Sequence, residues 1–469
     1  MIDSSRIVFV IAAVLTLGQA PPAPDKAVDD VFAAYTRPGA PGCAVGVIRD
    51  SKLVFERGYG LANVEHDLAL TSRTVFDIGS TSKQFTAAAI FLLEQHGRLS
   101  VTDDVRKFVP ELPSYGETIT IRHLLNHTSG IRDYLTLMSV AGVNFDGVTT
   151  DEDALKLIVR QKALNFTPGS EHLYSNSGYF LLSVIVKRAS GKSLRAFAEE
   201  HIFGPLEMHD THFHDDHTMP VPRRATAYAP GPDGTFRIDM SGFEQTGDGA
   251  VYTTIEDLAK WDRNFYQPKV GGKALVDALL RNGILTDGRT LPYAAGLVHG
   301  KYKGLETVSH GGSWAGYRAD LVRFPDQRLS VICLCNRADG NPGAKARQVA
   351  EVFLATEIAP EQRSSEPSPS PARAKPPASS APALTPAELS QLAGTYYSEE
   401  LDITRQLSVG GGKLAYTGPG TTARTLEPLG GDRFGAGPWQ LELTRDSAGN
   451  VTGFLLHAGR IRGLRFTKR

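Results

Sequence analysis

Phe76-Asp77-Ile78-Gly79-Ser80-Thr81-Ser82-Lys83-Gln84-Phe85 joins a turn to a predicted helix, and this stretch decides the interpretation of the chain. Apolar residues after the turn recur at i, i+3, i+4 and i+7, the spacing of one helix face: Phe85, Ala88, Ala89 and Leu92. Ser80 is therefore predicted at the helix N-terminus. Residues three apart share a helix face, so the Lys83 amine is expected to reach the Ser80 hydroxyl.

A serine and a lysine in this relation can form a nucleophile and its base. A lysine in a desolvated pocket can lose its proton and activate a hydroxyl, and free N–H groups at a helix N-terminus favour developing negative charge. The alternative is that Ser80 is an N-cap and Lys83 a solvated first-turn residue. Ser-x-x-Lys is a weak pattern, although it occurs once in this chain, so the other motifs decide.

Two later segments carry polar groups suited to a cleft. In residues 168–179, Tyr174 and Asn176 alternate to one side of an irregular segment; the alternative is a half-buried tyrosine beside a turn-forming asparagine. In residues 309–317, the pair Gly311-Gly312 would let a substrate backbone approach, and the Ser313 N–H is a candidate oxyanion-hole donor. A glycine-rich strand edge or bulge is the alternative there.

The order of these motifs resembles the serine β-lactamase and penicillin-binding protein superfamily. Ser-x-x-Lys, Tyr-x-Asn and a basic residue-x-Gly follow one another, and Tyr174-Ser175-Asn176 points to the class C β-lactamase-like branch with its esterases, D-aminopeptidases and D,D-peptidases. The resemblance extends from about Pro38 to about Ala355. Three further segments support it: Leu124-Leu125-Asn126-His127-Thr128-Ser129-Gly130-Ile131, Gly204-Pro205-Leu206-Glu207-Met208 and Tyr293-Ala294-Ala295-Gly296-Leu297.

The resemblance implies a role for each site residue. Ser80 would be the acylated nucleophile, Lys83 would activate it, and Tyr174 would move protons to the leaving group and the hydrolytic water. The implied substrate-binding residues are Asn176, His310, Gly311 and Gly312. The backbone N–H groups of Ser80 and Ser313 would form the oxyanion hole.

Two residues depart from the antibiotic-hydrolysing pattern. His310 stands where lysine is usual, and a histidine, with a reference pKa of about 6.5, is not a permanent cation for a substrate carboxylate. His310-Gly311-Gly312 resembles the D-aminopeptidase and esterase members instead. Asp248 stands where a small uncharged residue is more usual. The sequence therefore predicts a serine hydrolase acting on a small-molecule ester, amide or peptide substrate, with a D-amino acid as one option.

Two other functions remain as alternatives. One is a β-lactamase or D,D-carboxypeptidase. The other is a weakly active peptidoglycan-binding or sensor module. An acyl adduct on Ser80 would separate an enzyme from a binding module.

The chain is predicted to hold an α+β hydrolase domain at 21–362 and a small antiparallel β-barrel, lipocalin-like, at 387–469. Between them, residues 363–386 are rich in Pro, Ser and Ala, a composition typical of an extended linker. Strands are expected at both ends of the first domain: 43–48, 52–57, 319–324 and 329–335. Helical segments fall between these ends, which favours one sheet with an inserted helical region.

The N-terminus is predicted to be a signal peptide, residues 1–20, and the protein to be exported to the periplasm or secreted. No stable membrane insertion is expected after cleavage. The net charge of −1 offers no basic field for nucleic acid, so no nucleic-acid partner is expected. The oligomeric state is left open.

No metal and no cofactor are expected. Residues 208–217 contain four histidines and three aspartates but lack His-Glu-x-x-His spacing. Cys333 and Cys335 share one face of a predicted strand and are expected to be packed thiols. With Cys43 the cysteine count is odd, so at least one thiol stays outside any intramolecular disulfide.

Overall fold

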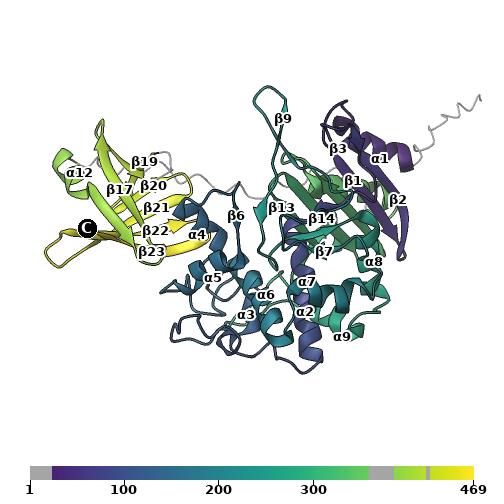
Figure 1. Cartoon of the computed structure of the whole chain (residues 1–469), viewed down its shortest axis with the longest axis horizontal. Helices are drawn as coiled ribbons and strands as arrows, with labels where there is room; N and C mark the ends of the chain where they lie inside the picture. The colour runs from purple at the N-terminus through teal and green to yellow at the C-terminus, as the bar shows by residue number, and fades with distance from the viewer. Residues whose placement is uncertain (1–23, 359–384, 419–422) are drawn as a thin grey trace, which may run out of the picture.

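The computed structural model describes residues 24–358, 385–418 and 423–469. Figure 1 shows two bodies, a larger one holding a sheet and most of the helices, and a barrel made by the C-terminal strands. The predicted signal peptide and nearly all of the predicted linker lie outside the described residues. Both stay predictions.

The larger body is built on an antiparallel sheet in the order β12-β13-β14-β15-β1-β2. Its strands are β1 (Cys43–Arg49), β2 (Lys52–Tyr59), β12 (Val298–Tyr302), β13 (Leu305–Trp314), β14 (Tyr317–Phe324) and β15 (Leu329–Cys335). β1 pairs with β15, so the two ends of the domain meet inside one sheet. The predicted strands are confirmed, and His310 to Ser313 lie within a further strand, β13.

Helices cover both faces of this sheet. β15 is buried along its whole length, with Val331 and Cys333 facing one hydrophobic core and Ile332 and Leu334 facing another. The first core is closed by α1 (Pro24–Phe32) and α10 (Pro342–Phe353), the second by the inserted helical region. The predicted α+β architecture is confirmed as a layered one.

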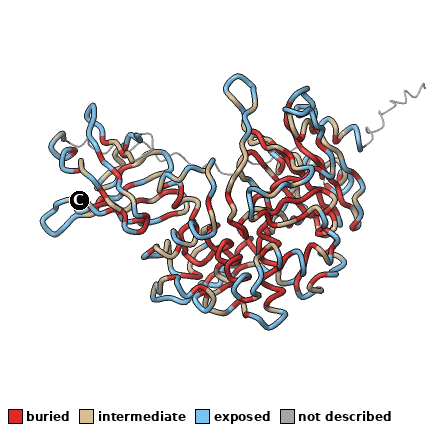
Figure 2. Tube along the Cα trace, in the orientation of Figure 1, coloured by how far each residue is buried: buried red, intermediate tan, exposed pale blue. Residues whose placement is uncertain are grey.

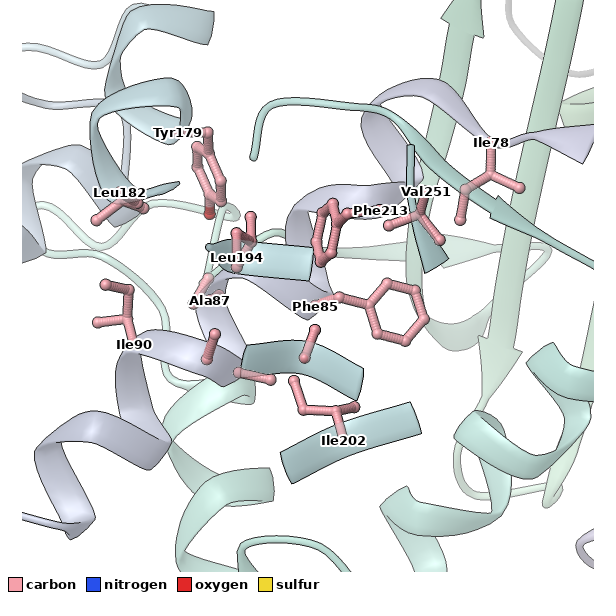
Figure 3. Packing of buried hydrophobic residues seen from close by; sticks show 14 of the residues in the cluster. Ile78, Phe85, Ala87, Ile90, Tyr179, Leu182, Leu194, Ile202, Phe213 and Val251 are labelled. Carbon is pink, nitrogen blue, oxygen red and sulfur yellow. The ribbon is translucent and has the colours of Figure 1, made fainter. Parts of the chain in front are cut away.

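The helix after the serine motif, α2 (Lys83–Gln95), is buried from Lys83 to Leu93. A helix that is apolar on all sides belongs in a core. Figure 3 shows Phe85 of this helix among Phe213, Val251 and Ile202, which come from three other segments. Figure 2 shows the same pattern at larger scale, with buried residues concentrated inside each body. This packing fixes the position of the turn that precedes α2.

The larger body contains further helices besides α1, α2 and α10. They are α3 (Ile121–Leu125), α4 (Tyr134–Ala141), α5 (Asp151–Val159), α6 (Asn176–Ser190), α7 (Leu194–Ala198), α8 (Ile255–Tyr266) and α9 (Gly272–Leu280), with short turns η1 (Ala33–Tyr35), η2 (Gly79–Ser82), η3 (Val105–Lys107) and η4 (Glu199–Phe203). The short strands are β3 (Leu61–Asn63), β4 (Leu68–Ala69), β5 (Phe76–Asp77), β6 (Val148–Thr149), β7 (His212–Phe213), β8 (Tyr228–Pro230), β9 (Phe236–Ile238), β10 (Gly242–Phe243) and β11 (Val251–Thr253). Among the described residues, no helix is both long and apolar enough to cross a membrane.

The strands described after residue 393 close into an antiparallel barrel, as predicted. They are β16 (Gly394–Ser398), β17 (Ile403–Gly410), β18 (Lys413–Thr417), β19 (Arg424–Gly430), β20 (Arg433–Ala436), β21 (Trp439–Arg445), β22 (Val451–Ala458) and β23 (Ile461–Lys468), preceded by α12 (Pro386–Leu392). Leu137 and Val140 of α4 belong to the barrel's hydrophobic core. Figure 1 accordingly places α4 against β22 and β23.

The expectation that Cys335 is a packed thiol is wrong. Cys43 on β1 lies opposite Cys335 on β15, and the two form a disulfide. Alternation along β15 places Cys333 and Cys335 on one face, as predicted, but it does not reveal which strand lies alongside. Cys333 remains a buried free thiol.

Candidate active site

Ser80 and Lys83 face each other across the junction between two helix types. Ser80 lies in the 3-10 turn η2, where side chains three residues apart eclipse, and Lys83 begins α2. The Lys83 Nζ donates to the Ser80 Oγ at 3.1 Å. The N-cap of α2 is Ser82, whose hydroxyl accepts from the Val251 N–H. The alternative in which Ser80 is an N-cap is therefore wrong.

Lys83 is fully buried and contacts three acceptors. Besides the Ser80 hydroxyl, its Nζ donates to the Asn176 Oδ1 at 3.0 Å and to the Asp248 backbone carbonyl. Asp248 thus binds Lys83 through its backbone carbonyl rather than through its side chain. Its carboxyl accepts from the Tyr134 hydroxyl at 3.1 Å, and burial raises the pKa of that carboxyl to about 6.

Two glycines let the serine turn lie directly against β13. A Cβ on Gly312 would come within 1.8 Å of the Ile78 carbonyl oxygen, and a Cβ on Gly79 within 2.7 Å of the Ser313 nitrogen. Gly79 also has a φ of +49°, which side chains rarely adopt. This contact places Ser80 and Ser313 on one cavity wall, the arrangement that the predicted oxyanion hole requires.

Asn176 begins α6 rather than lying in an irregular segment. The Asn176 N–H donates to the Asp133 Oδ2 at 2.7 Å, so a carboxylate from another segment takes the place of a local cap. Tyr174 precedes the helix, with its ring centroid 4.9 Å from the Lys83 Nζ. Its hydroxyl is buried and has no hydrogen-bond partner in the described part of the chain.

His127 packs against the Tyr174 ring. The centroids of the two rings are 4.1 Å apart, and the His127 Nδ1 accepts from the Ser175 N–H at 3.2 Å. Burial, together with the nearby Lys83 charge, lowers the pKa of His127 well below its ordinary value. A neutral imidazole therefore packs against the phenol.

His310 is a neutral residue in this site. Burial, with the Lys83 charge, lowers its pKa to about 4. Its Nδ1 lies 2.7 Å from the Gly311 carbonyl oxygen, to which only a protonated nitrogen can donate, and its Nε2 lies 3.2 Å from the Tyr293 hydroxyl. Position 310 thus carries no positive charge at neutral pH.

The predicted site residues converge on one cavity of about 640 Å³. Those that line it are Ser80, Tyr174, Asn176, His310, Gly311, Gly312 and Ser313. Lys83 does not line it and lies behind Ser80, within hydrogen-bond reach. The whole predicted set is therefore brought together.

Two residues at or near the cavity, Arg460 and Asp133, escaped the sequence interpretation. Arg460, in the turn between β22 and β23, lines the same cavity, so the barrel forms part of its wall. Asp133, which holds the start of α6, lies 3.6 Å from the Arg460 guanidinium. Asp133 follows the quoted segment 124–131 by two residues and could have been noticed there. Arg460 carries no local signal.

The histidine-rich segment 208–217 does not gather into a single site. His214 lines the cavity and lies 3.2 Å from His212, measured between ring nitrogens. His217 pairs with Glu244 at 2.7 Å, beside Asp216, in an arrangement that could hold a metal ion. The expected absence of a metal stays a prediction.

Comparison with known proteins identifies relatives of the larger body. The family model described as Beta-lactamase matches residues 28–355. Penicillin-binding protein 4* of Bacillus subtilis (strain 168) is 32% identical over 61% of this chain and 66% of its own length. A D-aminopeptidase of Gluconobacter oxydans (strain 621H) is 27% identical over 82% of this chain, and one of Brucella anthropi is 30% identical over 64%. The matches span 69% and 57% of those two enzymes.

Solved structures share the fold. The octameric penicillin-binding protein homologue from Pyrococcus abyssi superposes with a TM-score of 0.64 at 23% identity, covering 95% of this chain and 99% of its own. The D-amino acid amidase from Ochrobactrum anthropi SV3, complexed with D-phenylalanine, gives 0.60 at 20% identity, covering 71% and 99%. The family match, over most of the larger body, settles the classification: this chain belongs to the beta-lactamase family.

Proposed function

We propose that this protein is an exported serine hydrolase that cleaves amide bonds next to a D-amino acid through an acyl-enzyme on Ser80. The observation that carries the proposal is the 3.1 Å hydrogen bond between the Lys83 Nζ and the Ser80 Oγ at the wall of a cavity. Nucleophile and base within hydrogen-bond reach are the signature of covalent catalysis.

In the acylation step, the Ser80 Oγ bonds to the substrate carbonyl carbon while its proton passes to the Lys83 amine, which serves as the base once it has given up a proton of its own. The carbonyl oxygen gains the electron pair and lies between the N–H groups of Ser80 and Ser313. As the C–N bond breaks, Tyr174 gives its phenolic proton to the leaving amine. Lys83 then returns a proton to Tyr174, so both groups regain their starting forms.

In the deacylation step, water attacks the acyl carbon and loses a proton to Lys83 through the Tyr174 phenol. The Ser80–carbonyl bond breaks, the Ser80 oxygen takes up that proton, and the acid is released. The buried Tyr174 hydroxyl has no partner within the described residues, which supports this shuttle because an unpaired buried phenol is costly without a role. Ester substrates follow the same steps, with an alcohol as the leaving group.

The preference for a D-residue rests on relatives. Two of them are D-aminopeptidases, and this chain spans only part of each. Export is supported by the apolar segment 7–17 and by the Cys43–Cys335 disulfide, since such bonds persist in oxidising compartments.

Enantiomeric substrates test the proposal. D-alanine p-nitroanilide and L-alanine p-nitroanilide are offered to wild type and to Ser80→Ala. We expect at least a tenfold higher kcat/KM for the D-substrate, and background rates for the variant. Equal activity of the Ser80→Ala variant would refute the serine mechanism, and a preference for the L-substrate would refute the assigned specificity.

A further inference from the structure

We propose that Arg460, supplied by the barrel, is a specificity-determining residue that binds a carboxylate on the leaving group of the substrate. The site would then prefer short peptides with a free C-terminal carboxylate over the corresponding amides. This inference rests on the proposed hydrolase function and adds the substrate class. It also gives the barrel a direct role in the active site.

Arg460 lies where the leaving group is expected. Its guanidinium carbon is 4.6 Å from the ring centroid of Tyr174, and both residues line the cavity that holds Ser80. Tyr174 is the proposed proton donor to the departing amine. A carboxylate one residue beyond the scissile bond therefore falls within reach of Arg460.

The turn that carries Arg460 is held in place by the larger body. The Asn165 Nδ2 donates to the Arg460 carbonyl at 2.9 Å, and the Asn165 Oδ1 accepts from the Arg462 N–H at 2.7 Å. The Arg132 Nε donates to the Arg462 carbonyl at 3.1 Å. These three bonds hold the backbone at Arg460 and Arg462, so the Arg460 side chain enters the cavity from a preorganised backbone.

The guanidinium of Arg460 has free donor capacity. Among the described residues it meets no hydrogen-bond acceptor, and its ion pair with the Asp133 Oδ2 is 3.6 Å long. Asp133 is already occupied, because its oxygens accept from the Asn176 N–H and from the Thr136 N–H and hydroxyl. A guanidinium presents paired donors that match a carboxylate.

The other basic side chains at or just behind the cavity are partly engaged or neutral. Arg318 donates from one nitrogen to the carbonyls of Ala315 and Tyr317, both at 2.6 Å. Lys83 is held by three acceptors, and His310 is uncharged. A lysine at position 310 would supply a cation for a substrate carboxylate, and the neutral His310 does not. Arg460 of the barrel can supply that cation instead.

Two substrates that differ only at the carboxylate test this inference: D-alanyl-glycine and D-alanyl-glycinamide. The measured quantity is the ratio of their kcat/KM values. We expect a ratio above about 10 for wild type and a 10- to 100-fold fall in this ratio for Arg460→Gln, the range of a lost charge-assisted hydrogen bond. Arg460→Lys should restore part of the ratio.

Arg462→Gln is the matched control. Arg462 lies on the same hairpin with a similar exposed fraction, 43% against 42%, and pairs across the junction with Glu171 at 2.9 Å, but it does not line the cavity. The kcat/KM ratio of Arg462→Gln should equal that of wild type. An equal fall of this ratio in Arg460→Gln and Arg462→Gln would overturn the inference, because it would show that any loss of charge at the junction between the two bodies has the same effect.

The remaining outcomes separate the two proposals. Ser80-dependent hydrolysis with a wild-type ratio near 1, or a ratio that Arg460→Gln leaves intact, would overturn the assignment of Arg460 alone. Failure of Ser80-dependent hydrolysis of both substrates would overturn the proposed function and this inference together.

Discussion

Arg132 and Glu400 form an ion pair across the junction between the two bodies, with 2.5 Å between nitrogen and oxygen. Their side chains are 1% and 6% exposed. Arg132 also reaches the turn that carries Arg460. The pair therefore links the placement of the barrel to the cavity wall.

Glu400→Gln should lower the free energy of unfolding by about 3 kcal/mol, because it leaves the Arg132 charge buried without its partner. The double variant Arg132→Met/Glu400→Leu should recover most of that loss, since neither charge remains. Urea unfolding measures both. A single variant within 0.5 kcal/mol of wild type would show that the pair does not hold the junction.

Tyr174→Phe should lower kcat/KM by about 10²- to 10⁴-fold, the contribution of a positioned proton donor. Its stability should equal or exceed that of wild type, because the lost hydroxyl is buried without a partner in the described residues. Tyr179→Phe is the matched control. The Tyr179 hydroxyl donates to the Leu125 carbonyl, so this variant should lose about 1 kcal/mol of stability with a much smaller effect on rate. The reverse pattern would contradict the role of Tyr174.

Gly312→Ala should separate β13 from the serine turn, because its Cβ would overlap the Ile78 carbonyl oxygen. We expect a loss of about 2 kcal/mol or more in stability and a larger loss in kcat/KM. Gly311→Ala supplies the comparison, since the nearest atoms to its Cβ lie at an ordinary 3.5 Å. Equal unfolding midpoints for the two variants would show that the close approach is not required.

His310→Asn tests the neutral state of the imidazole. Its folded pKa of about 4 lies below the unfolded reference of about 6.5, so between these values the unfolded chain binds more protons. Wild type should therefore lose stability as pH falls from 6.5 to 4, by up to about 3 kcal/mol from this residue. Relative to wild type, the variant should gain that amount between pH 7.5 and 4.5. A constant difference across this range in urea unfolding would contradict the low pKa.

The sequence predicted the strands at both ends of the domain and the convergence of Ser80, Lys83, Tyr174 and Asn176, because these features follow from local spacing and motif order. It did not predict that α6 begins at Asn176, since the Asn176 N–H is satisfied by Asp133 from another segment. Capping preferences concern only residues that are neighbours in the sequence.

The disulfide and Arg460 were missed for a related reason. Alternation along β15 placed Cys335 on one face but did not identify Cys43 as its cross-strand neighbour. Arg460 reaches the cavity because the barrel docks on the larger body, where Leu137 and Val140 of α4 pack into the barrel core. Such contacts depend on tertiary docking, which no periodicity within a single segment encodes.

Intact-protein mass spectrometry with a fluorophosphonate tests the central claim, the nucleophilic role of Ser80, most directly. Wild type should gain the mass of one phosphonyl group, which peptide mapping places on Ser80, and Ser80→Ala should gain none. An unmodified wild type, or the same adduct on Ser80→Ala, would contradict the assignment of Ser80 as the nucleophile.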